Sequence, residues 1–312
     1  MTDFRMFIND HAFAEMTPAQ LSLSQQAAAY VSTLLGPAPA GGHAVGKGGR
    51  GPCRICGVTT QLTFEHVPPR SAGNRQPRRG VDLATDLQSA PGVMPRSGWI
   101  QQQRGAGAYA TCTSCNSLGG KLYVPAYSDA ASAACLALRE FIGTLPEDDD
   151  SGPPESIRFS THGEFFPGAV VRQALFMIMA MSGSAGVGEA FPILRHIVLE
   201  DVAHELPEEI RLRLSLVITS RIRIHPVVAQ VDVATMQYRA LLETAHLPFA
   251  WLAEIGPESS YPSPQVSSWT MFTSTDEADI ELRLPVGSIA TAIPADYRHS
   301  WQVPAEDLAA DT

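Results

Sequence analysis

The spacing of hydrophobic positions changes along the chain and predicts helices first, then strands. Residues 17–35, "TPAQLSLSQQAAAYVSTLL", predict a helix with Thr17 as N-cap and Pro18 in the first turn. Residues 166–184, "FPGAVVRQALFMIMAMSGS", are apolar nearly all round and predict a buried helix. Four later stretches have a β-like composition with partial alternation, which predicts strands at 194–199, 213–226, 248–256 and 280–286.

Two stretches without periodicity divide the chain. The first is a Gly/Pro/Ala-rich linker at 36–51, and the second is "EDDDSGPP" at 147–154. They predict an N-terminal helical segment with its linker, a cysteine-bearing module and a third domain of unknown role, at 1–50, 51–145 and 155–305. The expected fold class is α+β, and the third domain is expected to contain an antiparallel sheet.

Composition sets the class of protein. The chain has 312 residues, of which 45% are hydrophobic and 17% charged, as in a globular protein. No run of apolar residues is long enough to span a bilayer. The N-terminus has no basic segment ahead of an apolar run, so we expect no secretory signal, no membrane partner and a cytoplasmic location.

Four of the five cysteines form two C-x-x-C pairs, Cys53/Cys56 and Cys112/Cys115. In a reducing compartment two such pairs are typical of a structural zinc site, because four thiolates complete a tetrahedron. The 55 residues between the pairs exceed the usual zinc-ribbon spacing. A redox pair is the alternative, although the thioredoxin-like βαβ context is absent. Cys135 lies on an apolar helical stretch and is expected to be a buried small hydrophobe.

The net charge of one segment differs in sign from that of the whole chain. The chain carries a formal net charge of −10, whereas the segment from Lys47 to Lys121 has ten basic and three acidic residues and is +7. A cluster such as "RSAGNRQPRR" is either a solvated loop or a contact surface for a polyanion. The acidic total therefore does not exclude a nucleic-acid partner. The histidines of the third domain lack ligand spacing, and we expect them to be surface or core residues.

The stretches "CRICGVTTQLTFEHVPPRSAG" and "CTSCNSLGGK" together resemble the HNH endonuclease family, in its branch with a C-x-x-C…C-x-x-C zinc site. The resemblance covers about a quarter of the chain and includes an acid–His pair, a following Pro, a Gly-bearing loop and an Asn after the second knuckle. It implies a zinc-stabilised ββα-metal, treble-clef-like module. The matching residues are Cys53, Cys56, Glu65, His66, Pro69, Gly73, Cys112, Cys115 and Asn116.

By this resemblance His66 is the general base that activates water for phosphodiester hydrolysis. Glu65 and Asn116 are ligands of one catalytic Mg²⁺ or Mn²⁺, which stabilises the leaving oxygen. The implied substrate is double-stranded DNA, and the third domain would supply a homodimer interface or bind an accessory protein. Phage defence or mobile-element processing is the setting that it suggests. The expected phosphate contacts are Arg70, Arg75, Arg78, Arg79, Arg104 and Lys121.

The chain departs from the family pattern at three points. Glu65 stands where the family often has Asp, and Gly107 stands where its middle Asn usually orients the base. Asn116 replaces the third His by analogy with RNA-guided CRISPR nucleases. A zinc-stabilised nucleic-acid-binding module without catalysis remains the main alternative, and an interaction protein folded by zinc is a third. For Asn116 the simpler interpretation is a helix cap, and for Trp99 and Tyr109 it is core packing.

Overall fold

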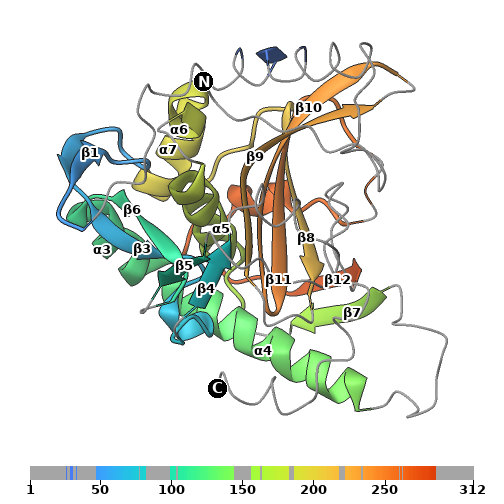
Figure 1. Cartoon of the computed structure of the whole chain (residues 1–312). Coiled ribbons are helices and arrows are strands. Elements are labelled where there is room, and N and C mark those ends of the chain that lie inside the picture. The colour runs from blue at the N-terminus through green and yellow to red at the C-terminus, as the bar shows by residue number, and fades with distance from the viewer. Residues whose placement is uncertain are drawn as a thin grey trace.

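The computed structural model arranges the elements in two groups on either side of a long buried helix, α5 (Figure 1). One group carries the cysteines, and the other contains a four-stranded sheet. The structure describes residues 26, 29–30, 33, 47–76, 78–81, 99–102, 105–143, 156–161, 164–182, 186–217, 222–232, 235–259, 261 and 263–285.

Short antiparallel ladders make up the cysteine-bearing region. In the described residues β1 pairs with β2, β3 with β6, and β4 with β5. In the sequence β4 and β5 lie between β3 and β6, so a long connection joins the two strands of the β3–β6 pair. The strands are β1 (Arg50–Pro52), β2 (Thr59–Gln61), β3 (Thr63–His66), β4 (Arg78–Val81), β5 (Trp99–Gln102) and β6 (Gly107–Thr111).

Two consecutive helices follow β6. Helix α3 (Thr113–Leu122) begins directly after the strand, and α4 (Val124–Ile142) continues from it with a proline in its first turn. A single 3₁₀ turn, η1 (Arg70–Ala72), packs against α4. The order β3, β6, α3 therefore gives two antiparallel strands followed by a helix.

The second group is built on an antiparallel sheet of order β8-β11-β10-β9. Its strands are β8 (Ile210–Leu216), β9 (Arg223–Asp232), β10 (Gln237–His246) and β11 (Phe249–Ile255). All seven residues of β11 are buried, as expected for a central strand covered on both faces. A separate ladder pairs β7 (Ser156–Thr161) with β12 (Ile280–Pro285). The mixture of helices with an antiparallel sheet confirms the predicted α+β class.

Helix α5 (Pro167–Met181) joins the two groups. Every residue from 167 to 180 is buried, because the helix packs on β9 and β10 and also on β6, α3 and α4. Its one charged residue, Arg172, is fully buried. Arg172 Nε lies 3.1 Å from Asp201 Oδ1 in a salt bridge. All three guanidinium nitrogens of Arg172 also donate to backbone carbonyl oxygens. The helix predicted from the apolar stretch at 166–184 is thus confirmed.

The strand prediction for 194–199 is wrong, because these residues belong to helix α7 (Pro192–Glu200). Leu194, Ile197 and Val198 are buried and follow the i, i+3, i+4 spacing of a helix face. Pro192 occupies the first turn, where it costs no hydrogen bond. The β-branched content of this short run therefore misled the prediction. A short helix, α6 (Gly186–Ala190), precedes α7, and the 3₁₀ turn η2 (Ser267–Met271) packs against α5 and β8.

One hydrophobic core runs through both groups. Its buried residues include Ile55 in the first cysteine pair, Val67 directly after β3, and Leu214 and Trp251 in the sheet. The two groups therefore pack as one body in the part of the chain that the structure describes. The predicted linker at 147–154 lies outside these residues.

A buried hydrogen-bond chain connects α4 to the sheet. Trp251 Nε1 donates to the Tyr127 hydroxyl at 3.2 Å, and that hydroxyl lies 2.8 Å from His246 Nε2. His246 Nδ1 lies 3.1 Å from the Leu247 carbonyl oxygen, which can only accept, so Nδ1 carries the proton and Nε2 accepts from Tyr127. Burial lowers the pKa of His246 to about 4, and the ring stays neutral.

The N-terminal helix prediction falls mostly outside the described residues. Gln26, Ala29, Tyr30 and Thr33 are helical, and the Tyr238 hydroxyl donates to Gln26 Oε1 at 2.6 Å, which places this segment against β10. Among the helices that the structure describes, none combines the length and the apolar character needed to cross a bilayer.

Candidate metal centre and cleft

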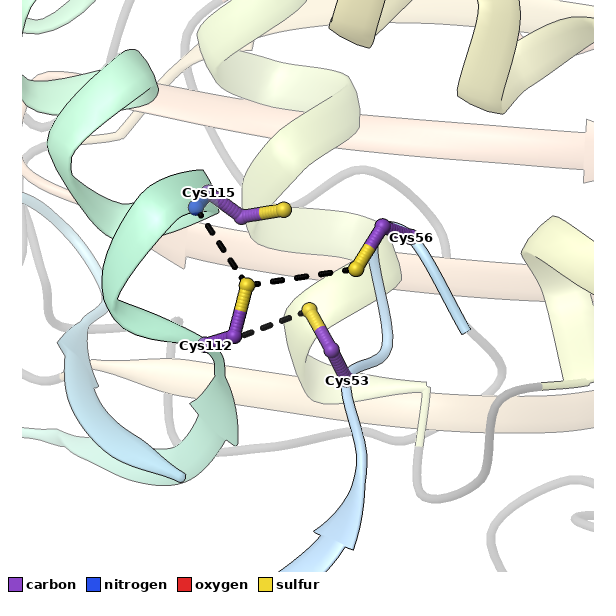
Figure 2. Close-up of side chains that lie close together, drawn as sticks. All are labelled: Cys53, Cys56, Cys112 and Cys115. Carbon is purple, nitrogen blue, oxygen red and sulfur yellow. Dashed lines mark hydrogen bonds between the residues drawn. The ribbon is translucent and has the colours of Figure 1, made fainter. Parts of the chain in front are cut away.

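The four cysteines of the two C-x-x-C pairs come together. Figure 2 shows the sulfur atoms of Cys53 and Cys56, from the turn after β1, facing those of Cys112 and Cys115 at the start of α3. All four Sγ atoms lie within 4.8 Å of one another, and Cys56 Sγ is 3.9 Å from Cys112 Sγ. Among the described residues this is the only group of three or more His, Cys, Asp or Glu side chains close enough to share a metal ion.

The cluster fits a zinc ion. Zn–S bonds of about 2.3 Å place the sulfurs of a tetrahedron about 3.8 Å apart, close to the Cys56–Cys112 separation. Hydrogen bonds from Cys115 and from backbone N–H groups lower the pKa of Cys53 to about 4. The same contact with Cys53 raises the pKa of Cys115, and burial raises that of Cys56. Four neighbouring thiols can all ionise only beside a cation, and a zinc ion would supply that charge.

Local hydrogen bonds shape both knuckles. In the first, Gly57 N donates to the Cys53 carbonyl oxygen at 2.7 Å and closes a tight turn. In the second, Cys112 is the N-cap of α3, and its Sγ accepts from Cys115 N at 3.4 Å. The interpretation of Asn116 as the cap of this helix is therefore wrong.

Glu65 and His66 point to opposite sides of β3, as their adjacency on a strand predicts. The Glu65 side chain faces inward and is 7% exposed, whereas His66 is half-buried. Burial raises the pKa of Glu65 to about 8. A hydrogen bond from the Thr111 side chain acts in the opposite direction, and the Cys53 charge raises the pKa further. The carboxyl is therefore poised to hold a proton near neutral pH unless a cation takes its place.

An open cleft of about 580 Å³ lies against this pair. It brings together residues from the end of β3, from the turn η1 and from the start of both α3 and α4. The cleft is lined by Glu65, His66, Pro69, Arg70, Ser71, Arg75, Asn116 and Val124. Three residues that the sequence pattern assigns to chemistry, Glu65, His66 and Asn116, thus line one cavity.

The Asn116 side chain is oriented by β3. Its Nδ2 donates to Thr63 Oγ1 at 3.0 Å and to the Phe64 carbonyl oxygen at 3.2 Å. The amide nitrogen is therefore committed to the strand, and Oδ1 is the atom that remains to accept a donor or a cation. Such an oxygen is a suitable ligand for a hard divalent ion.

Sequence reasoning assigned no role to Asn74, which the structure places at the centre of the loop after His66. Asn74 is fully buried, and its Nδ2 donates to the Pro68 and Ala106 carbonyl oxygens, each at 2.7 Å. Its Oδ1 accepts from Ala106 N at 2.7 Å. Gly105 adopts φ +94°, and a Cβ there would overlap Asn74. The one signal in the sequence was the Gly-Asn pair at 73–74, which is typical of a turn.

The predicted phosphate contacts divide into three sets. Arg70 and Arg75 are exposed and line the cleft, with Arg75 Nε donating to the Arg70 carbonyl oxygen at 3.3 Å. Lys121 is exposed near the C-terminal end of α3 and is not among the cleft residues. Arg78 and Arg79 lie on β4, whose side-chain positions are outside the described structure, as is Arg104 entirely.

The remaining predictions concern residues away from the cleft. Cys135 was expected to be a buried small hydrophobe, but on α4 it is only half-buried. Tyr109 packs against the hydrophobic core, in agreement with core packing, whereas the Trp99 side chain is outside the described residues.

Comparisons of the chain with protein-family models, with curated proteins and with solved structures gave no match.

Proposed function

We propose that this chain is a metal-dependent endonuclease of the HNH type that hydrolyses phosphodiester bonds of DNA. The observation that carries the proposal is that Glu65, His66 and Asn116 line one open cleft together with two arginines. The chain order of two antiparallel strands and a helix, with a thiol cluster at the helix start, supports a zinc-stabilised ββα-metal module.

His66 is the general base in this proposal. Its imidazole is half-buried and lines the cleft at the end of β3, so water can reach it while the strand fixes its backbone. An unprotonated ring nitrogen accepts a proton from the attacking water, and the ordinary pKa of histidine suits this task near neutral pH.

Glu65 and Asn116 would hold the catalytic cation. The buried Glu65 carboxyl exchanges its proton for the ion, and Asn116 contributes Oδ1 because its Nδ2 is bonded to β3. A bound Mg²⁺ or Mn²⁺ supplies Lewis-acid stabilisation of the charge that develops on the leaving oxygen. Both ligands line the cleft that His66 also lines at the end of β3, so water, phosphate and cation can meet there.

Arg70 and Arg75 supply the contact with the substrate. Their exposed guanidinium groups on the cleft rim suit the phosphates of a nucleic-acid backbone. Residues of the second group pack against the module through α5 and support it. They are also the expected site of a homodimer contact or of an accessory protein.

The test uses the full chain loaded with zinc and a supercoiled plasmid, with Mg²⁺ or Mn²⁺ compared against chelator. We expect cleavage only with the divalent ion. Glu65→Gln is the matched variant, because the amide keeps the shape and the capacity to accept from Thr111 but carries no charge. It should retain zinc and thermal stability, and cleavage should fall at least tenfold.

The main alternative is a nucleic-acid-binding module without catalysis. It predicts that the wild type binds DNA but cleaves neither DNA nor RNA with any divalent ion. That result would overturn the nuclease proposal, whereas loss of both binding and cleavage would leave the interaction protein as the explanation.

A further inference from the structure

We propose that Phe64 positions the imidazole of His66 in the space that Gly107 leaves without a side chain. This inference deepens the proposed nuclease function and rests on it. Phe64 and His66 are two residues apart on β3, so both side chains lie on one face. On the paired strand the partners are Tyr109 opposite Phe64 and Gly107 opposite His66.

Three rings form a row on this face. The Phe64 and His66 ring centroids are 4.9 Å apart at an interplanar angle of 75°, and Phe64 and Tyr109 are 5.3 Å apart at 76°. Both contacts are T-shaped, the arrangement that aromatic rings prefer. Phe64 therefore stands between a core-packed tyrosine and the imidazole at the cleft.

Gly107 makes room for this arrangement. A Cβ atom at position 107 would overlap the Glu65 carbonyl oxygen and would lie 2.9 Å from Phe64 Cε1. The Glu65 backbone excludes a larger residue at this position, and the Phe64 ring occupies the space that Gly107 leaves beside it. The ring that fills the space beside Gly107 is the one in contact with His66.

Phe64 contributes little to the hydrophobic core. It is half-buried and, among the described residues, it is absent from both core clusters, whereas Tyr109 packs against the larger one. A ring that contributes little to the core but contacts the proposed base on one side restricts the rotamers of that base. It holds the imidazole toward the cleft, while Asn74 fixes the adjoining backbone at Ala106.

The kinetic test compares Phe64→Leu, which keeps an apolar side chain but loses the ring, with Phe64→Tyr, which keeps the ring. Single-turnover cleavage at saturating DNA should fall about 10-fold to 100-fold in Phe64→Leu, because a small displacement of a catalytic group has this effect. DNA affinity, zinc content and thermal stability should stay near wild type. Phe64→Tyr should cleave within about threefold of wild type, because it keeps the ring that contacts His66. Equal rates in all three proteins would overturn the inference.

A second readout is independent of cleavage. Ring-proton signals of His66, identified by their loss in His66→Ala, should show cross-relaxation with Phe64 ring protons in the zinc-loaded wild type. In Phe64→Leu the three-bond couplings about the His66 Cα–Cβ bond should change from a single rotamer to averaged values. Unchanged couplings would contradict positioning by Phe64. If the wild type cleaves no nucleic acid, the nuclease proposal fails, and the couplings alone decide whether Phe64 holds the ring.

Discussion

Asn116 Nδ2 lies 3.2 Å from the carbonyl oxygen of Phe64, and this hydrogen bond ties helix α3 to the strand that carries Glu65 and His66. The residue before Asn116 is Cys115, one of the four clustered thiols. The position of the cleft residues therefore depends on the cysteine cluster, because the same turn of α3 belongs to both. A metal ion at the thiols would act on the site through this helix.

Replacement of Cys112 should unfold this region. Cys112→Ser removes a proposed zinc ligand, while the serine hydroxyl can still accept at the N-cap of α3. Structural zinc contributes on the order of 10 kcal/mol to the folding of small zinc modules, so we expect insoluble protein or a large drop in the unfolding temperature. Cys135→Ser, away from the cluster, is the control and should behave like wild type. Metal analysis that finds no stoichiometric zinc in purified wild type would refute the zinc assignment.

Asn74 should be a strong determinant of stability. Asn74→Ala leaves the Pro68 carbonyl oxygen and the Ala106 N–H without their partner, whereas the Ala106 carbonyl oxygen keeps its bond from Val67 N. Each unsatisfied buried group costs about 1–3 kcal/mol, so we expect the free energy of unfolding in urea to fall by about 3 kcal/mol. Asn74→Asp should be at least as destabilising near neutral pH, since its second oxygen would face two carbonyl oxygens. A decrease below about 1 kcal/mol for both variants would show that other interactions hold the loop.

Electrostatic binding should depend on the arginines of the cleft. The double variant Arg70→Ala/Arg75→Ala should bind duplex DNA more weakly and with a shallower salt dependence. The log–log slope should decrease by about 0.9 for each phosphate that the variant no longer neutralises. Arg158→Ala is the matched control, because Arg158 is exposed on β7 and pairs with Glu281 at 2.7 Å, outside the cleft. Equal slopes for wild type and the double variant would mean that these arginines do not bind phosphate.

Acid should destabilise the protein partly through His246. Its folded pKa is about 4, below the value of 6.5 for a free histidine, so the unfolded chain binds a proton first as the pH falls. This contribution is absent above pH 6.5 and grows as the pH falls toward 4, reaching about 2 kcal/mol near pH 5. His246→Gln keeps an acceptor for the Tyr127 hydroxyl and should flatten the stability–pH curve between pH 7 and 5. His204→Gln, at an exposed site, should leave the slope unchanged; an equally steep curve for His246→Gln would contradict this origin.

The parts of the molecule that local patterns encode were predictable. The paired C-x-x-C motifs predicted a cluster of thiols, and the apolar stretch at 166–184 predicted the buried helix α5. Alternation on β3 predicted that Glu65 and His66 face opposite sides. These features follow from the sequence because each depends either on residues close together in the chain or on the shared metal-binding chemistry of the four thiols.

Features that depend on distant parts of the chain were not predictable. The burial of Asn74 depends on Ala106, which reaches it only when β3 and β6 pair across their long connection. The short run at 194–199 is compatible with a strand or a helix face, and packing against α5 decides for the helix. The packing of Phe64 against His66 requires the space at Gly107, which no periodicity reveals.

The measurement that tests the central claim most directly is single-turnover cleavage by His66→Ala beside wild type, with DNA affinity measured in parallel. His66 lies on the open cleft and is not one of the clustered thiols, so folding, zinc content and DNA affinity should stay near wild type. Cleavage should fall by about 10²–10⁴, the usual contribution of a positioned general base. A His66→Ala protein that cleaves as fast as wild type would contradict the assignment of His66 as the base.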